Sequence, residues 1–372
     1  MPGLPFFDDA ASGPVRAPTI EVTISSSGGD SGGFGGMADT ASSLLGAPSA
    51  PSWADYLVSL SLHQGFAPNV DQVDLLIADN EGAPQASLGD RGTIAIGAAD
   101  ALEDIFSGSI IAIERRGDRM RRYRLGNGSH DLAQARINQS VINMSVQDAI
   151  SNAASDFNYS PQADVGGSDE ALPQIVFDDS STVWDHCAYL AGLRGANLWF
   201  DATDALQLAD QLEQGDSVAT FTWGEDLLEA NLWQRSAHSG AITAFGGDRV
   251  DGDFVLRKQA TPNRAEQGDG LPPRFYRDGL LQTQQDLSTR AAAAALYGQR
   301  QTSVSEIVVS GSAALGPGRV VELASLPDGG DGNYLIHRSH HTFDHNNGWR
   351  TRLSISEASG ASGLGGLGGG LL

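Results

Sequence analysis

The end of the chain alternates between hydrophobic and polar residues in three short runs. The runs cover residues 319–323, 334–341 and 349–355, and turns rich in Gly, Asn and Asp separate them. Alternation with a period of two places every second side chain on one face, which is typical of half-buried antiparallel strands, and such turns favour hairpins. Residues 315–355 therefore predict a three-stranded β-meander.

An earlier segment, residues 89–125, has the same pattern. Its strand runs align in order with those of the final meander: 93–96 with 320–323, 105–114 with 333–342, and 123–125 with 351–353. Self-similarity at this spacing predicts one β-module that was used twice. The alternative is chance likeness, because any two β-meanders share alternation and turn patterns.

The remaining pattern predicts the fold class. Alternating runs at residues 18–25, 56–63 and 71–79 supply enough strands for a closed or nearly closed antiparallel barrel around the first meander. Apolar residues recur at helical spacing in 146–156 and 181–195, and an alanine-rich helix is expected at 289–299. The expected fold is mainly β (α+β): two small antiparallel β-barrel domains with an α/β insert between them. The predicted divisions are an irregular N-terminus (1–17), a first β-barrel (18–128, with a flexible stretch at 26–49), an α/β insert (129–237), a second β-barrel with its preceding helix (238–357) and a Gly-rich tail (358–372).

Composition excludes several classes of protein. The net charge is −23 and Lys258 is the only lysine, which argues against binding nucleic acid by neutralising phosphates, although an acidic proteome would explain the charge equally well. No apolar run is long enough to span a bilayer, so no membrane anchoring is expected. The single cysteine, Cys187, excludes an internal disulfide framework and is compatible with a reducing cytoplasm. Its place on the apolar face of a predicted helix favours a buried small side chain over a nucleophile.

No catalytic, cofactor or metal site is predicted. A histidine cluster invites a metal hypothesis, because imidazole is a good zinc ligand; its members are His337, His340, His341 and His345. A strand would place His340 on the face opposite His337 and His341, and no recognised ligand spacing accompanies them, so structural roles are favoured. Acidic pairs such as Asp178-Asp179 are better explained as solvated turns, because adjacent carboxylates do not by themselves flank a cleft.

A basic hairpin stands out in the acidic chain. Residues 114–124 carry six arginines and predict a strand–turn–strand tip. A short run of this kind is more often a contact for an acidic partner subunit than a nucleic-acid site, because the remaining charge repels phosphate. Tryptophans such as Trp349 are expected to be core or interface anchors. The candidate structural or interface residues are Arg115, Arg116, Arg119, Arg121, Arg122, Trp349 and His341.

The closing segment resembles the phage late control protein D family, which comprises the baseplate hubs of contractile tails and the hub part of VgrG spikes. The family's three closing strand motifs match in order at Gly318, Val320 and Leu323, then Tyr334, Ile336 and His341, then Gly348, Trp349, Thr351, Leu353 and Ile355. Trp349 replaces the usual Tyr. Residues 289–301 and 182–210 resemble the helix before the final barrel and a helix-plus-hairpin of the family, so that the likeness covers residues 18–357. The stretch at 26–49 departs from the family, which has a short turn there.

The resemblance implies tube-like barrels and a structural baseplate hub. Three copies would form a homotrimer that connects the six-fold tail tube to the three-fold central spike, around an acidic channel. The implied partners are a tail tube or tube-initiator protein, a separate spike protein and baseplate wedge proteins, with phage DNA only as a transient passenger. A separate spike is expected because no Val/Gly-rich repeat follows the last barrel. The implied location is the virion tail baseplate, assembled in the host cytoplasm. Two alternatives stay open, a tail-associated cell-wall hydrolase and a carbohydrate-binding or adhesion module.

Overall fold

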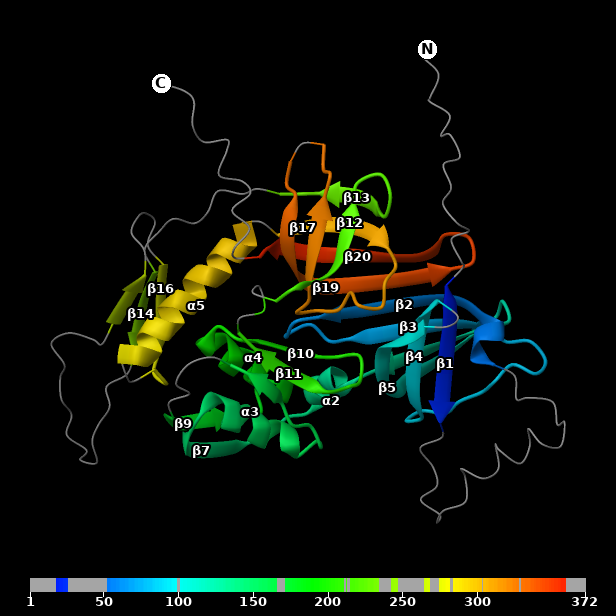
Figure 1. Ribbon diagram of the computed structural model, residues 1–372. Coiled ribbons are helices and arrows are strands. Elements are labelled where there is room, and N and C mark those ends of the chain that lie inside the picture. The colour runs from blue at the N-terminus through cyan, green and yellow to red at the C-terminus, as the bar shows by residue number, and fades with distance from the viewer. Residues whose placement is uncertain are drawn as a thin grey trace.

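The structure is mainly β, as the alternation predicted. The computed structural model describes residues 18–25, 52–98, 101–165, 171–210, 212, 215–233, 242–246, 264–267, 274–281, 284–302, 304–327 and 329–358. Within them, one 12-stranded sheet dominates, and the α-helices gather on one side of it (Figure 1). The predicted irregular N-terminus (1–17), the predicted flexible stretch at 26–49 and the tail from residue 359 onward lie outside the described residues.

The first β-module has six strands in the order β1–β4–β5–β6–β3–β2. Their bounds are β1 Thr19–Ser25, β2 Leu57–Gly65, β3 Gln72–Ala78, β4 Arg91–Ala98, β5 Ala101–Arg116 and β6 Met120–Gly126. Every second side chain, including Leu62, Val73 and Tyr123, points into one core. The 3-10 helix η1, Trp53–Tyr56, lies against β1 and β3. Trp53 packs edge-on against Tyr123 there, with 5.2 Å between ring centroids.

The second β-module also has six strands, in the order β12–β18–β19–β20–β17–β13. Their bounds are β12 Ser217–Thr222, β13 Leu227–Asn231, β17 Ser305–Ser310, β18 Val320–Ala324, β19 Gly332–Asp344 and β20 Gly348–Glu357. Ile307, Val321 and Leu353 are among the residues of its core. The predicted closing meander corresponds to β18, β19 and β20.

The two modules have the same strand order. In each, the strands that come first, fourth, fifth, sixth, third and second along the chain follow one another across the sheet. They differ at the first pair, because β1 is antiparallel to β4 whereas β12 is parallel to β18. The predicted internal repeat is therefore confirmed as a repeat of strand order.

Two β-bulges align the modules residue by residue. One interrupts β5 between Ile110 and Ala112, and the other interrupts β19 between Ile336 and Arg338, so that Ala112 and Arg338 are equivalent. The sequence alignment matched Ala112 with His340, two residues away. Because the side-chain period of a strand is two residues, such an error leaves every side chain on its correct face. Alternation alone could not detect it.

The modules are joined into one sheet by β2 and β19. These strands pair antiparallel, from Ser59 opposite Asp344 to Gly65 opposite Arg338. β2 is an edge strand of the first module, whereas β19 is central in the second. The edge of one module thus continues on an inner strand of the other.

The α/β insert follows the first module. Its elements are α2 Gly128–Gln134, β7 Gln139–Met144, α3 Val146–Ser155, β8 Gln162–Asp164, β9 Leu172–Phe177, α4 Val183–Arg194, β10 Asn197–Phe200 and β11 Leu206–Ala209. Helix α4 begins after a capping box formed by Thr182 and Asp185 and ends at Gly195, whose φ of 75° favours glycine. Cys187 of α4 is buried in the insert core, as expected, and burial raises the pKa of its thiol to about 12.

A final small subdomain packs on the insert. It contains β14 Ile242–Gly246, β15 Arg264–Gln267, β16 Arg274–Asp278 and α5 Gln284–Thr302. Ile242 and Leu287 share the hydrophobic core of α4. The predicted boundary at residue 237 separates β12 and β13 from the rest of the second module. Both strands come before this boundary in the chain, but they hydrogen-bond to strands of the second module. The boundaries of independently folding units stay a prediction.

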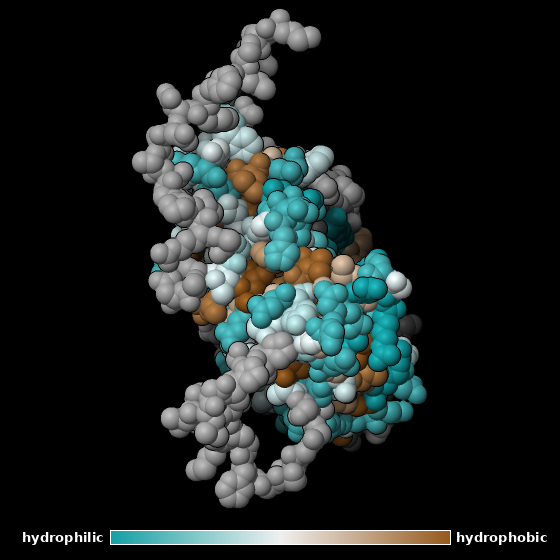
Figure 2. Space-filling view, turned by 90° about the vertical axis from the view of Figure 1, so that its right-hand side faces the viewer, coloured by the Kyte–Doolittle hydropathy of each residue, from teal (hydrophilic) through white to brown (hydrophobic). Residues whose placement is uncertain are grey.

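The face of the molecule on the side of the first module is mostly polar. Seen from the side of the first module, hydrophilic side chains predominate and hydrophobic ones form small separate patches (Figure 2). Within the described ranges, no helix has both the length and the hydrophobicity of a membrane-spanning segment.

Candidate assembly surfaces

Polar side chains line the solvent-facing side of the junction between the modules. His63 of β2 lies directly opposite His340 of β19, and their rings stack with 3.8 Å between centroids. The Ser61 hydroxyl lies 2.9 Å from His340 Nε2. Sequence analysis found His340 but missed His63, because only the tertiary structure brings two strands so distant in sequence together.

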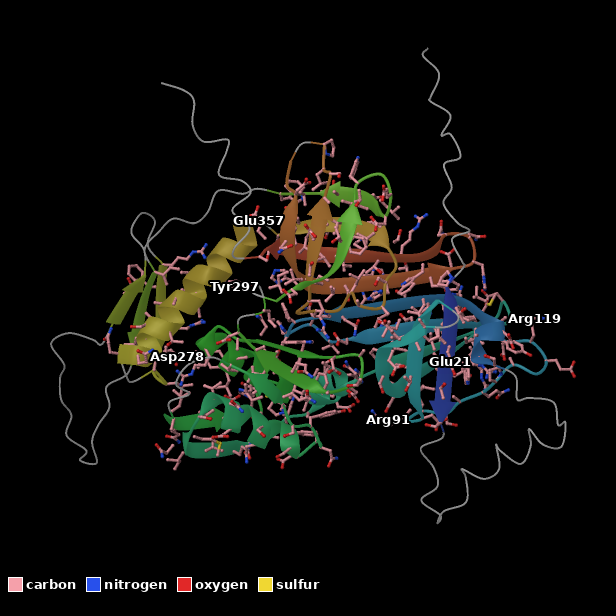
Figure 3. The ribbon with its side chains drawn as sticks, in the orientation of Figure 1. Glu21, Arg91, Arg119, Asp278, Tyr297 and Glu357 are labelled. Atoms are coloured by element: carbon pink, nitrogen blue, oxygen red, sulfur yellow. The ribbon has the colours of Figure 1, made fainter. Side chains whose placement is uncertain are left out.

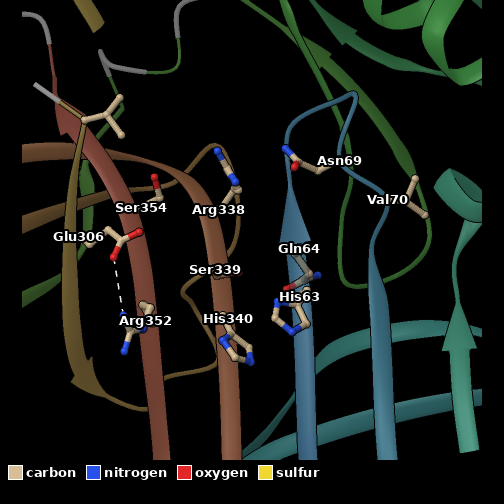
Figure 4. A pocket seen from close by; sticks show the side chains of 11 residues that line it. His63, Gln64, Asn69, Val70, Glu306, Arg338, Ser339, His340, Arg352 and Ser354 are labelled. Carbon is tan, nitrogen blue, oxygen red and sulfur yellow. Dashed lines mark ion pairs between the residues drawn. The ribbon is translucent and has the colours of Figure 1, made fainter. Parts of the chain in front are cut away.

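A shallow depression of about 380 Å³ crosses this junction (Figure 4). His63, His340 and Arg338 line it from β2 and β19. Arg352 of β20 pairs with Glu306 of β17 at 3.6 Å on its other side. The stacked rings of His63 and His340 and the charged side chains around them suit a surface that contacts another protein. In the described part of the chain, no three ligating side chains gather as a metal site requires.

Each of the four histidines of the predicted cluster has its own hydrogen-bond partners. His337 Nε2 lies 2.7 Å from the Ser356 hydroxyl, and His345 Nε2 lies 2.8 Å from the carbonyl of Leu57. His340 bonds Ser61, as described above, and burial together with His63 and Arg352 lowers the pKa of His340 to about 4. The cluster therefore fastens β19 to its neighbours.

His341 is the fully buried member of the cluster. Its Nε2 lies 3.0 Å from the carbonyl of Leu315, and its Nδ1 lies 2.9 Å from the Thr351 hydroxyl. A neutral ring that donates to the carbonyl and accepts from the hydroxyl satisfies both nitrogens. Burial lowers the pKa of His341 to about 4, so the folded state prefers this neutral form.

The buried histidine predicts a measurable pH dependence. Between pH 7.5 and pH 5, the wild-type chain should lose about 2 kcal/mol more unfolding free energy than a His341→Gln variant. The folded-state pKa of His341 lies below the ordinary value of 6.5, so its contribution is complete above pH 6.5 and is lost as the pH falls toward 4. Urea unfolding curves at both pH values measure the difference.

A second buried group makes the variant comparison necessary. Burial raises the pKa of Asp71 to about 7, so its contribution has the opposite sign: stability is lost as the pH rises from about 4 to 7. Asp71 is present in both proteins and cancels when they are compared. Equal losses in wild type and variant would contradict the role assigned to His341.

The basic hairpin lies at the outer end of the first module. It is the β5–β6 hairpin, and Arg119 lies at its tip in the left-handed region with φ 59°, at the periphery of the molecule (Figure 3). Arg115 is exposed. Arg116 pairs with Asp118 at 3.3 Å, and Arg122 pairs with Glu114 at 3.1 Å. These four arginines are accessible to a partner.

Arg121 differs from its neighbours, because it is buried. It forms an ion pair with Asp79 at 2.7 Å and donates to the Tyr123 hydroxyl at 3.0 Å. On β6, residues 121, 123 and 125 face the core, and Arg122 and Arg124 face outward. The period of two thus places Arg121 inside the module, where a partner cannot reach it. Contact with a partner subunit stays a prediction for the exposed arginines.

Trp349 is an anchor within the protein. Its half-buried indole packs over Gly311, where any Cβ would lie 2.1 Å from the ring. The Gly311 N–H also donates to the Trp349 carbonyl at 3.1 Å. Only glycine allows β20 and the preceding loop to approach this closely.

A second, larger cleft, of about 650 Å³, lies between the insert and both modules. Trp199 and Phe200 line it, and Trp199 packs edge-on against Phe66 at 5.5 Å and over Gly318, whose φ is +81°. This indole therefore holds the insert against the second module, and it is not an open platform of the kind that binds sugars.

Comparisons with known structures give several matches over most of the chain. The tail protein from Neisseria meningitidis MC58 is 15% identical, with a TM-score of 0.65, over 92% of this chain and 96% of that chain. The 43 kDa tail protein of prophage MuSo2 from Shewanella oneidensis is 13% identical, with a TM-score of 0.65, over 91% and 98%. Neither profiles of known protein families nor curated protein sequences match the chain.

A third similar structure comes from a secretion system. The c3393 protein of E. coli is described as a component of the type VI secretion system with structural similarity to the T4 bacteriophage tail proteins gp27 and gp5. It is 13% identical to this chain, with a TM-score of 0.54, over 83% of this chain and 75% of that one. This chain therefore has the fold of the phage tail proteins that the closing motifs of its sequence had indicated.

Proposed function

We propose that the chain is a structural baseplate hub protein of a contractile phage tail or a related injection particle, located at the virion tail baseplate. The observation that carries this proposal is the duplicated topology: two six-stranded modules share one strand order and one sheet. The similar folds of two tail proteins and of a type VI secretion component support it.

Duplication suits a protein that adapts one symmetry to another. Three copies of a chain with two like modules present six like units to a six-fold tail tube. The same ring keeps true three-fold symmetry, because the insert between the modules occurs once per chain, and can seat a three-fold spike. The proposed partners are thus a second and third copy, a tail tube or tube-initiator protein, a separate spike protein and baseplate wedge proteins.

The outward face of the joined sheet suits a channel wall. Arg124 pairs across the strands with Asp74 at 3.0 Å, and Arg122 and Arg352 also face carboxylates. Cross-strand pairs of opposite charge leave this face polar with much of its charge balanced, although the whole chain carries −23. Such a wall lets DNA pass without holding its phosphates. The role requires no catalytic group.

The mass of the protein in solution tests the proposal. Light scattering or native mass spectrometry should give three times the chain mass of 38.9 kDa, and negative-stain images should show rings with a central opening. A monomer at tens of micromolar, together with cleavage of cell-wall glycan or binding to it, would instead favour a hydrolase or an adhesion module.

A further inference from the structure

β19 uses one of its edges for two partners. On the edge away from β20, residues 332–335 pair with β18, and residues 338–344 pair with β2 of the other module. The bulge at His337 separates the two parts. The second half of this edge is thus where the sheet of one module continues into the sheet of the next.

β5, the strand equivalent to β19, has a strand partner along only the first part of the corresponding edge. On the edge away from β6, β4 pairs with β5 as far as Ser109, and the Ile110 amide and carbonyl bond residues 90 and 89. Beyond the bulge, no strand in the described ranges pairs with Ala112–Arg116 on this edge. An unpaired strand edge is a template for another strand.

β13, the strand equivalent to β2, lies at the opposite end of the sheet (Figure 1). Both strands have a bulge at the same place, after Leu57 in β2 and after Leu227 in β13. Ser61 and Asn231 are therefore equivalent. β2 pairs on both edges, whereas β13 pairs with a named strand, β17, on one edge among the described residues.

The register within the sheet is that of a closed barrel. A path perpendicular to the strands runs from Ala112 through Arg124, Asp74 and Ser61 to Thr342. Thr342 lies four residues beyond the equivalent of Ala112, so the register climbs by one residue per strand. With about 3.4 Å per residue and about 4.8 Å between strands, this climb means a strand tilt of about 35°, within the range of closed barrels.

We infer that β13 of one copy, with the two residues that follow it, pairs antiparallel with Ala112–Arg116 of the next copy, in the register that β2 has with β19. This rests on the proposed function, since it specifies how the copies of the hub meet. Within the chain, Ser61 lies opposite Thr342. Asn231 is the equivalent of Ser61, and Arg116 is the equivalent of Thr342, so Asn231 lies opposite Arg116 of the next copy. The two edges differ, so the contact is heterologous and forms a ring if it closes.

The side chains at the two edges suit this register. Trp233 is the equivalent of His63 and lies opposite Glu114 of the next copy, with Arg116 as its diagonal neighbour. Trp233 is 58% exposed in the single chain. An indole covered by a strand bearing a guanidinium gains both buried area and a cation–π contact. The sheet would then run unbroken from each chain into the next, with β5–β6–β3–β2–β19–β20–β17–β13 as the contribution of each copy.

Cysteine cross-linking of the full chain tests the register. Asn231→Cys combined with Arg116→Cys should oxidise to a disulfide-linked trimer on non-reducing gels, because the two positions lie directly opposite each other only between copies. Each single variant should give no trimer. The matched control is Asn231→Cys with Ala112→Cys, which lies on the same face but four residues out of register, and it should cross-link at least tenfold less. Cys187 is buried and does not compete.

The outcomes separate this inference from the hub proposal. If the protein is a trimer by mass but cross-links only through the Ala112 pair, or through neither pair, the inferred strand pairing is wrong and the hub proposal stands. If wild type is a monomer at every concentration, both fail. Thermal unfolding of each variant confirms that the exposed cysteines leave the fold intact.

Discussion

Replacing Trp184 by alanine is expected to destabilise the protein by about 3–5 kcal/mol. Trp184 is 1% exposed in the insert core, and its indole N–H donates to the carbonyl of Asn69 at 3.0 Å, which fastens α4 to the first module. The substitution leaves a large cavity and an unsatisfied carbonyl. Trp184→Phe fills most of the volume and should cost less than half as much. Urea unfolding monitored by circular dichroism measures both.

Trp233→Ala is the matched control for this prediction. The exposed Trp233 follows β13 at the inferred contact between copies. Its loss should change the unfolding free energy by less than about 1 kcal/mol, yet shift the trimer toward monomer on dilution by at least tenfold. Destabilisation by Trp233→Ala as large as that by Trp184→Ala would mean that Trp233 is a folding anchor, against the role inferred for it.

Gly108→Ala is expected to destabilise the protein by about 3 kcal/mol, although alanine is a small residue. Gly108 lies where β5 leaves β4 and continues beside β6. A Cβ there would lie 2.3 Å from the carbonyl oxygen of Gly126 and 2.8 Å from the Phe106 ring. Since the first of these is backbone of a neighbouring strand, relief requires the strands to separate.

Gly117→Ala provides the comparison, because no heavy atom lies within 4 Å of a Cβ at that position. It lies in the turn between β5 and β6, and its substitution should leave the melting temperature unchanged within a degree or two. If Gly108→Ala has the same melting temperature as Gly117→Ala and wild type, the close approach of β5 to Gly126 is not essential to the first module.

The proposed assembly links these stability effects to function. Trp184 and Gly108 set the shape of one chain, whereas Trp233, Asn231 and Arg116 lie at the two strand edges that we infer meet between chains. A variant of the first kind should lose folding and assembly together. A variant of the second kind should lose assembly alone, which is the signature of an interface residue.

The sequence by itself determined most strands of the two modules, helix α4 and the faces that they bury. Period-two alternation located the strands of both modules, helical spacing with Gly195 at the end located α4, and the place of Cys187 on an apolar face predicted its burial. These features depend on neighbours within a few residues, because side-chain direction follows from local backbone geometry. The repeat was visible for the same reason, since both copies carry the same local pattern.

Only the tertiary structure decided which strands meet and in what register. The two-residue correction that pairs Ala112 with Arg338, the stacking of His63 on His340, and the burial of Arg121 against Asp79 all depend on segments far apart in the chain. Alternation cannot distinguish registers that differ by two residues, since both bury the same faces. The β-bulges and the close contact at Gly108 fix that choice, and they arise only when the strands pack together.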